Sequence, residues 1–114
     1  MKVLIVDDND KTRMLIRMII EPHGHEILES INGADAVQTF HSVHPDVVCM
    51  DYEMPGINGV IAAEEIMASY PEARILMVTL YDNQQLRESA KKAGIEKFVL
   101  KENLSDLPDF LKNE

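Results

Sequence analysis

The sequence contains a single cysteine, Cys49, and no tryptophan. One cysteine excludes a disulfide framework within the chain, and chains without disulfides are typical of reducing, intracellular compartments. Because Cys49 lies inside an apolar run, we interpret it as a small buried core residue. The sequence therefore indicates a cytoplasmic protein.

Basic residues are also scarce, because 11 Lys and Arg stand against 20 Asp and Glu and give a formal net charge of −9. An acidic surface repels nucleic-acid phosphates, so we expect no direct nucleic-acid binding by this segment. The charge instead favours cations or basic partner surfaces. No apolar run approaches the roughly 20 residues of a membrane span, and the first is too short for a signal peptide. We therefore expect no membrane association.

What the sequence does contain is a set of short apolar runs that each end in a polar residue. Mostly continuous runs of this kind are typical of strands covered on both faces of a parallel sheet. The carboxyl ends of parallel strands meet at one edge, and α/β sheets bind ligands there. The runs and their following residues are 3–6 with Asp7 and Asp8, 47–50 with Asp51, 75–78 with Thr79, and 98–100 with Lys101.

Segments with helical spacing separate these runs. We predict helices over roughly 10–21, 33–43, 58–69 and 83–93, a weaker strand at 26–29, and a short last helix from about Ser105. The alternation gives five βα units. It predicts an α/β fold with a doubly wound parallel sheet, in one domain over residues 1–114.

Polar residues mark the predicted helix starts, and glycine or proline marks their ends. We expect N-caps at Asp10, Asn32 and Asp82, and we expect Gly94 to close the fourth helix. In the first helix, the face expected to pack on the sheet consists of Met14, Leu15, Met18 and Ile19.

The acidic residues at the predicted strand ends suit a divalent metal. Magnesium prefers hard oxygen ligands, typically one or two carboxylates completed by waters and phosphate oxygens. Asp7 and Asp8 can supply one direct and one water-bridged ligand, although such pairs also occur as solvated turns or helix caps. Asp51 lies at the mouth of the sheet, where a helix cap is its alternative role. The turn signal at residues 55–56 and the close backbone approach that Gly59 allows favour a functional loop.

Thr79 and Lys101, each taken alone, fit ordinary roles as a strand-end residue and a solvated charge. Their joint placement with the three aspartates argues against coincidence. Three carboxylates, one hydroxyl and one ammonium group at one sheet edge indicate a metal and phosphoryl-transfer site.

In this ordered set, the chain resembles the receiver domain of response regulators in two-component signalling, over essentially its whole length. The resemblance is carried by Asp7, Asp8, Asp51, Met54, Pro55, Gly56, Gly59, Thr79 and Lys101. It implies a flavodoxin-like (βα)5 fold with five strands in the order 2-1-3-4-5. The resemblance, and not the periodicity, supplies this strand order.

The resemblance also implies the reaction. Asp51 is the expected phosphoacceptor, and its phosphoryl group comes from a histidine kinase, a phosphotransfer protein or a small acyl phosphate. Mg²⁺ is the expected cofactor, bound by Asp8, Asp51 and the backbone carbonyl of Glu53, with Asp7 contributing directly or through water. Lys101 is expected to pair with Asp51 and then with a phosphoryl oxygen.

Thr79 is expected to hydrogen-bond another phosphoryl oxygen, and Thr79 and Phe98 are the expected switch residues between two packings. The family often has a small residue after this threonine, where Leu80 could narrow access to the site. It usually has proline after the lysine, where this chain has Glu102, so we predict a trans peptide bond there. At positions that tune phosphoryl lifetime, Tyr81 could shield the phosphoryl group and Glu53 could position a water.

We expect no enzymatic activity beyond self-phosphorylation and self-dephosphorylation. One alternative is a magnesium-dependent phosphohydrolase with Asp51 as nucleophile. Such an enzyme needs a second acid near the nucleophile, and Glu53 is the candidate for it. Another is a pseudo-receiver that only binds partners, which the complete set of site residues disfavours. A phosphorylation-dependent homodimer is also expected, through a face that combines basic residues at 87, 91, 92 and 97 with acidic residues at 102, 106 and 109.

Overall fold

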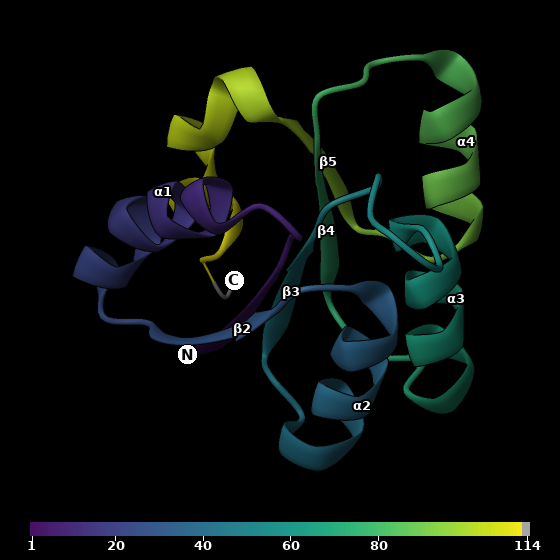
Figure 1. Ribbon diagram of the computed structural model, residues 1–114, viewed down its shortest axis with the longest axis horizontal. Helices are drawn as coiled ribbons and strands as arrows, with labels where there is room; N and C mark the ends of the chain where they lie inside the picture. Colours follow the sequence, from purple (N-terminus) through teal and green to yellow (C-terminus); the bar gives the residue numbers. More distant parts are fainter. Residues whose placement is uncertain (113–114) are drawn as a thin grey trace.

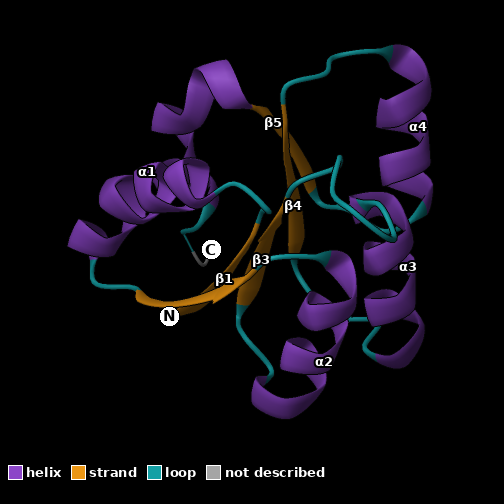
Figure 2. Ribbon diagram, in the orientation of Figure 1, coloured by secondary structure: helices purple, strands orange, loops and turns teal. Residues whose placement is uncertain are grey.

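The apolar runs form five parallel strands of one sheet in the computed structural model, which describes residues 1–112 (Figures 1 and 2). The strand order is β2-β1-β3-β4-β5, so the predicted fold and strand order are confirmed. The strands are β1 Lys2–Val6, β2 Glu26–Ser30, β3 Val47–Met50, β4 Ile75–Thr79 and β5 Lys97–Leu100.

Helices cover both faces of this sheet (Figure 1). The helices are α1 Asp10–Ile20, α2 Gly33–Val43, α3 Gly59–Ser69, α4 Gln84–Lys92 and α5 Leu107–Phe110, with 3₁₀ turns at Glu21–His23 and Lys101–Asp106. α1 and α5 pack on one face, and α2, α3 and α4 pack on the other. Among the described residues, no helix has the length and apolar character that a membrane crossing needs. The last two residues of the predicted domain, 113–114, lie outside the described part.

The central strands divide the hydrophobic core into two layers. Alternate residues of β1 point to opposite faces, so Leu4 and Val6 join the α2–α4 layer while Val3 and Ile5 join the α1–α5 layer. The buried methionines of residues 1–112 belong to the α2–α4 layer and are Met50, Met54 and Met77. Cys49 lies in the α1–α5 layer, and burial raises the pKa of its thiol to about 12, so the thiol stays protonated.

Asparagine side chains cap the first four helices. Asn32 caps α2 as predicted, and Gly94 adopts the left-handed conformation that was expected after α4. The cap of α1 is Asn9 and not Asp10, and the cap of α4 is Asn83 and not Asp82. Both asparagines have extended backbones, and the side-chain oxygen of each accepts a hydrogen bond from the backbone amide three residues later. This arrangement is typical of an N-cap. Two neighbouring Asx residues at each start made this choice ambiguous in the sequence.

The predicted inner face of α1 is wrong. Met14, Leu15 and Met18 are 61%, 47% and 65% exposed, and Ile19 is only partly buried. The buried residues of α1 are Arg13, Ile16 and Ile20. These positions also follow helical spacing, so α1 carries two overlapping stripes and periodicity alone cannot choose between them. The buried stripe includes Arg13, whose side chain is hydrogen-bonded to polar partners.

Candidate functional site

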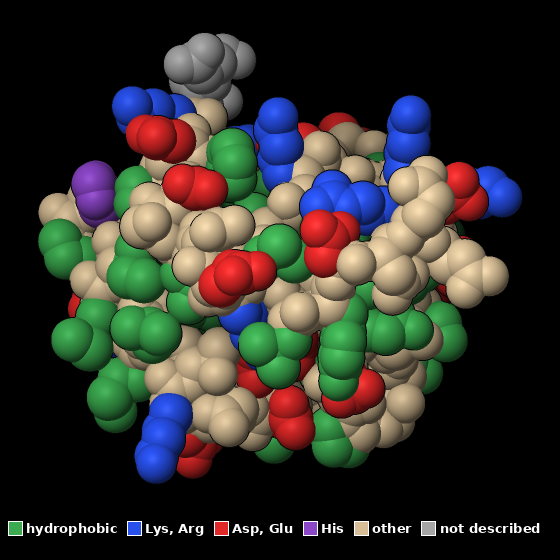
Figure 3. Space-filling view, turned by 90° about the horizontal axis from the view of Figure 1, so that it is seen from above, with side chains coloured by type: hydrophobic (Ala, Val, Ile, Leu, Met, Phe, Trp, Pro, Cys, Tyr) green, Lys and Arg blue, Asp and Glu red, His purple; other side chains and the backbone are tan. Residues whose placement is uncertain are grey.

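The polar residues predicted at the strand ends meet at the carboxyl edge of the sheet. Asp7 and Asp8 follow β1, Asp51 follows β3, Thr79 ends β4 and Lys101 follows β5. Because β1, β3, β4 and β5 are successive neighbours in the sheet, these positions converge. A pocket of about 540 Å³ opens here, lined by Asp7, Asp8, Asn9, Thr12, Asp51, Glu53, Met54, Pro55, Leu80, Tyr81 and Lys101. Figure 3 views the molecule from this edge.

The three aspartates form an acidic cluster. One carboxylate oxygen from each of Asp7, Asp8 and Asp51 lies within 4.8 Å of the others. Asp7 and Asp51 are buried, whereas Asp8 is exposed at the rim of the pocket. Three hard oxygen donors with one side open to water fit the ligand set of a magnesium ion, which keeps several waters.

Lys101 is the cation that partly compensates this cluster. Its ammonium nitrogen lies 2.8 Å from Asp7 Oδ2 and 3.3 Å from Asp51 Oδ1. The predicted pairing with Asp51 is therefore present, but the shorter contact is to Asp7. Burial alone would lower the pKa of Lys101, yet the hydrogen bond to Asp7 and the charge of Asp51 outweigh burial and raise it. Lys101 therefore stays charged.

The peptide bond between Lys101 and Glu102 is trans as predicted, since residues 1–112 contain no cis peptide bond.

The carboxyl group of Asp51 is a weaker acid than an ordinary aspartate. Burial, followed by the negative charge of Asp7, raises its pKa from 3.8 to about 6, although Lys101 acts in the opposite direction. A carboxylate held in this way is destabilised as an anion. Any cation that approaches stabilises the ionised carboxylate, whether it is a metal ion alone or a metal ion that accompanies a phosphoryl group.

The loop after β3 holds Asp51 in place. The Gly59 amide donates a 2.8 Å hydrogen bond to the Tyr52 carbonyl. A Cβ atom on Gly59 would lie 2.1 Å from the carbonyl oxygen of Asp51, so only glycine allows this approach. Gly56 has a φ of +84°, as the predicted turn requires. Asn58 then caps α3 through the Ile61 amide.

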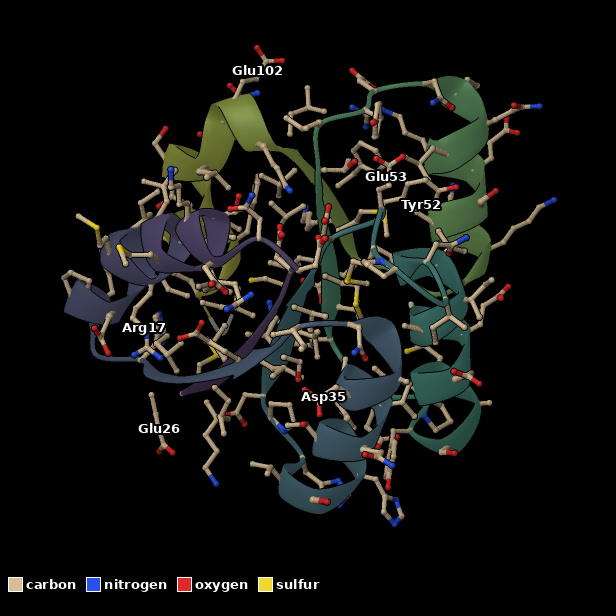
Figure 4. The ribbon with its side chains drawn as sticks, in the orientation of Figure 1. Arg17, Glu26, Asp35, Tyr52, Glu53 and Glu102 are labelled. Atoms are coloured by element: carbon tan, nitrogen blue, oxygen red, sulfur yellow. The ribbon has the colours of Figure 1, made fainter. Side chains whose placement is uncertain are left out.

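Thr79 and Tyr81 connect the β4–α4 loop to the site. Thr79 is buried, and its Oγ1 accepts a 3.1 Å hydrogen bond from the Tyr81 amide. The Tyr81 hydroxyl donates a 3.1 Å hydrogen bond to Glu53 Oε1, across the mouth of the pocket. Figure 4 shows Glu53 and its neighbour Tyr52 on the side of the site that faces α4. The role of the Glu53 carbonyl as a metal ligand stays a prediction.

Phe98 lies outside the pocket. It is half-buried on β5, opposite Met77 of β4, and packs against the α2–α4 layer. The guanidinium carbon of Arg87 lies 4.4 Å from the centre of its ring, a cation–π contact. Its switch role stays a prediction, because the structure links it to α4 and not directly to the site.

Sequence reasoning missed two residues that touch Asp7. The Asn9 amide donates a 2.9 Å hydrogen bond to Asp7 Oδ1, and Arg13 donates to the Asp7 carbonyl oxygen at 2.7 Å. The spacing of Asp10 and Arg13 is a pattern for an ion pair on one helix face, and it was the available signal. It could not indicate that the arginine is buried.

Comparison with known proteins gives consistent matches. The model of the response regulator receiver domain family matches residues 3–112. The chain is 40% identical over 101 residues to the chemotaxis protein CheY of Thermotoga maritima, covering 88% of this chain and 84% of that protein. Identity to the chemotaxis protein CheY of Bacillus subtilis is 38% over 101 residues, with the same coverage.

Solved structures give the same result. The response regulator protein TrrA of Thermotoga maritima, in complex with Mg²⁺ and BeF, superposes with a TM-score of 0.88 at 32% identity. The match covers 96% of this chain and 95% of that chain.

Proposed function

The chain belongs to the receiver domain family of two-component response regulators, and on this premise we propose that Asp51 is its phosphoacceptor. The observation that carries the proposal is the environment of the Asp51 carboxylate. It is buried at the mouth of the sheet, lies 3.3 Å from the Lys101 ammonium, and shares a cluster with Asp7 and Asp8. Asp51 directly follows β3, the strand at the centre of the sheet.

The proposed reaction is a direct phosphoryl transfer. An Asp51 oxygen attacks the phosphorus of a phosphohistidine or a small acyl phosphate, the new O–P bond forms, and the bond to the donor's leaving atom breaks. Lys101 neutralises negative charge on the phosphoryl oxygens. Thr79 uses its hydroxyl proton, which the hydrogen bond from Tyr81 leaves free, to donate to another oxygen.

Magnesium is the proposed cofactor. Asp8, Asp51 and the Glu53 backbone carbonyl would hold it, with Asp7 acting directly or through water. When bound, it offsets the charge of the transferring phosphoryl group. The similarity to TrrA, whose structure contains Mg²⁺ and BeF, supports this proposal, as does the all-oxygen donor set of this chain.

We propose a histidine kinase or phosphotransfer protein as phosphodonor, in the cytoplasm. Receiver domains are signalling domains and are generally not catalytic, so the activity proposed for this chain is limited to its own phosphorylation and dephosphorylation. The phosphohydrolase alternative is less favoured, because Tyr81 holds an oxygen of Glu53, the candidate second acid, in a hydrogen bond.

The test is labelling with acetyl phosphate and magnesium, followed by measurement of the intact mass. We expect one phosphate on wild type and none on Asp51→Asn. Asp46→Asn is the matched control, because Asp46 is exposed and precedes the same strand that Asp51 follows. Equal labelling of Asp51→Asn and wild type would contradict the assignment. Continuous release of phosphate would instead indicate a phosphohydrolase, and the absence of any label a binding module.

A further inference from the structure

Arg13 is a buried charged residue on α1 that the proposed reaction does not use. It is 9% exposed, although the helix offers solvent-facing positions to either side. A guanidinium group does not lose its proton in proteins, so its charge enters the interior with it. Burial of a charge is costly unless the group is paired and hydrogen-bonded. The hydrogen-bond partners of Arg13 therefore indicate which role the buried guanidinium group has.

Each nitrogen of the Arg13 guanidinium contacts a different segment. Nη1 donates to the backbone carbonyl oxygen of Asp7 at 2.7 Å, in a buried hydrogen bond. Nε donates to Glu29 Oε1 on β2 at 2.8 Å. Nη2 donates to the carboxylate of Asp10 in the first turn of α1. The planar fork thus ties the β1–α1 loop to both the helix and the neighbouring strand.

The contact with the Asp7 carbonyl bears on the acidic pair. This carbonyl belongs to the peptide unit that joins Asp7 to Asp8, and a peptide unit is rigid and planar. Fixing its oxygen therefore fixes the direction in which the chain enters Asp8. The Asp7 carboxylate is held separately, by the Asn9 amide at 2.9 Å and by Lys101 at 2.8 Å. Arg13 is thus the side chain that orients the backbone between the two acids.

Arg17 provides a natural comparison on the same helix. Its Nε and Nη2 donate to Glu29 Oε2 at 3.1 and 2.7 Å, so it shares the carboxylate that Arg13 uses. Its other side-chain hydrogen-bond partner within residues 1–112 is Glu21, at 2.8 Å, far along the helix from the site. Hydrogen bonds from both arginines lower the pKa of Glu29 against the effect of burial, so Glu29 stays ionised as a common anchor.

We infer that Arg13 is a positioning residue for the metal-binding acidic pair, which it orients by tying the Asp7 carbonyl to Glu29 of β2. The inference rests on the proposed function, since it assumes that Asp7 and Asp8 serve a magnesium ion. Groups that orient metal ligands from the second layer typically contribute 10- to 100-fold to metal affinity. Arg13 acts through the backbone and makes no contact with the ion.

The test compares Arg13→Met with Arg17→Met, which removes an equal charge and the same anchor contact but no contact with Asp7. Magnesium affinity is measured by titration, followed by the amide NMR shifts of residues around Asp51. We expect Arg13→Met to weaken magnesium binding about tenfold and Arg17→Met to leave it at the wild-type value. A readout without metal is hydrogen exchange of the Asn9 amide, which should accelerate in Arg13→Met only.

A second pair keeps the test decisive if Arg13→Met does not fold. Arg13→Lys retains the charge but lacks the planar fork, so it should also weaken binding relative to Arg17→Lys. Equal affinity and equal Asn9 exchange in the Arg13 and Arg17 variants would overturn the inference. Asp8→Ala separates this from a failure of the proposed function. If Asp8→Ala binds magnesium as wild type does, the metal site itself is wrong, and the inference falls with it.

Discussion

At the scale of single residues, Asp51 makes stability depend on pH in an unusual direction. Its pKa is raised from 3.8 to about 6, so the folded protein holds this proton more tightly than the unfolded chain does. Stability contributed by the protonated form is therefore lost as pH rises from about 4 through about 6. If Asp51 binds magnesium as proposed, we expect the same titration to weaken that binding as pH falls through about 6.

We therefore expect Asp51→Asn to raise the free energy of unfolding at pH 7 by up to about 3 kcal/mol in the absence of magnesium. The gain should vanish below about pH 4, where Asp51 of the wild type is protonated in both states. Urea unfolding at the two pH values measures the difference. Asp46→Asn should show no comparable gain, and a gain of equal size for both variants would contradict the argument.

Gly59 is a residue for which the missing side chain matters. A Cβ placed 2.1 Å from the Asp51 carbonyl oxygen forces the backbone of Asp51 to move. We expect Gly59→Ala to lower the free energy of unfolding by about 1–3 kcal/mol and to slow labelling of Asp51 by acetyl phosphate. Gly33→Ala is the comparison, because its Cβ would meet the side chain of Ile57 at 2.7 Å and not the backbone of Asp51. Gly33→Ala should slow labelling less, and the opposite ranking would count against this reading.

The sequence was sufficient to predict which residues end the strands, because a polar group after a continuous apolar run is a local pattern. Asp7, Asp51, Thr79 and Lys101 are where they were expected. Their contacts are not local. Lys101 lies closer to Asp7 than to Asp51, although 94 residues separate it from Asp7 in the chain. Such a preference follows from three-dimensional packing, which no short-range pattern encodes.

At the scale of elements, α1 shows where periodicity fails. Its apolar residues form two stripes, and the sheet buries the stripe of Ile16 and Ile20. The strands, by contrast, were predicted well, because continuous apolar runs leave no choice of face. The strand order came from family resemblance, since the order of strands across a sheet leaves no mark on the spacing of residues within them.

The corrected face of α1 is directly testable. We expect Ile16→Ala to lower the free energy of unfolding by about 2–5 kcal/mol, because it opens a cavity under a fully buried side chain. Met18→Ala should change it by less than about 0.5 kcal/mol, because Met18 is 65% exposed. Chemical denaturation of both variants measures the difference. Similar losses for the two would restore the original prediction.

Two loops are joined by the hydrogen bond between Tyr81 and Glu53, which spans the mouth of the site. Tyr81→Phe removes the hydroxyl and frees both Glu53 oxygens to position a water. We therefore expect the phosphoryl group on Asp51 to hydrolyse faster in Tyr81→Phe, measured as loss of the labelled mass with time.

The double variant Tyr81→Phe, Glu53→Ala separates the effect of the carboxylate from that of lost shielding. It should return the hydrolysis rate to the wild-type range. A double variant as fast as Tyr81→Phe alone would mean that Glu53 takes no part and that the Tyr81 hydroxyl itself shields the phosphoryl group.

At the scale of the whole molecule, the expected homodimer remains a proposal. Two of the basic residues expected at its interface, Arg87 and Lys97, already have contacts within the chain. Arg87 pairs with Asp82 at 2.6 Å and stacks on Phe98, and Lys97 lies 5.7 Å from the ring centre of Phe110. Lys91 and Lys92, in the last turn of α4, are exposed. They are therefore the better candidates for contact with acidic residues of a second copy.

Sedimentation with and without beryllofluoride tests this association. We expect the mimic to promote a dimer that weakens in high salt and in Lys91→Glu, Lys92→Glu, because exposed pairs are screened. Lys2→Glu, at the amino end of β1 and therefore at the opposite end of the strands from the site, is the control and should dimerise as wild type does. A monomer under every condition would exclude this interface.

The two layers of the core differ in how they can respond to a change at the site. Buried methionines, which are unbranched and polarizable, lie between the sheet and α2–α4, whereas the opposite layer is rich in valine, isoleucine and leucine. A thioether chain can change rotamer with little change in volume, but a β-branched side chain is stiff. We therefore expect a disturbance at Asp51 or Thr79 to be accommodated more readily by the methionine-containing layer toward α4 than by the layer toward α1. In that case α1 would keep its position on the sheet while α4 shifts.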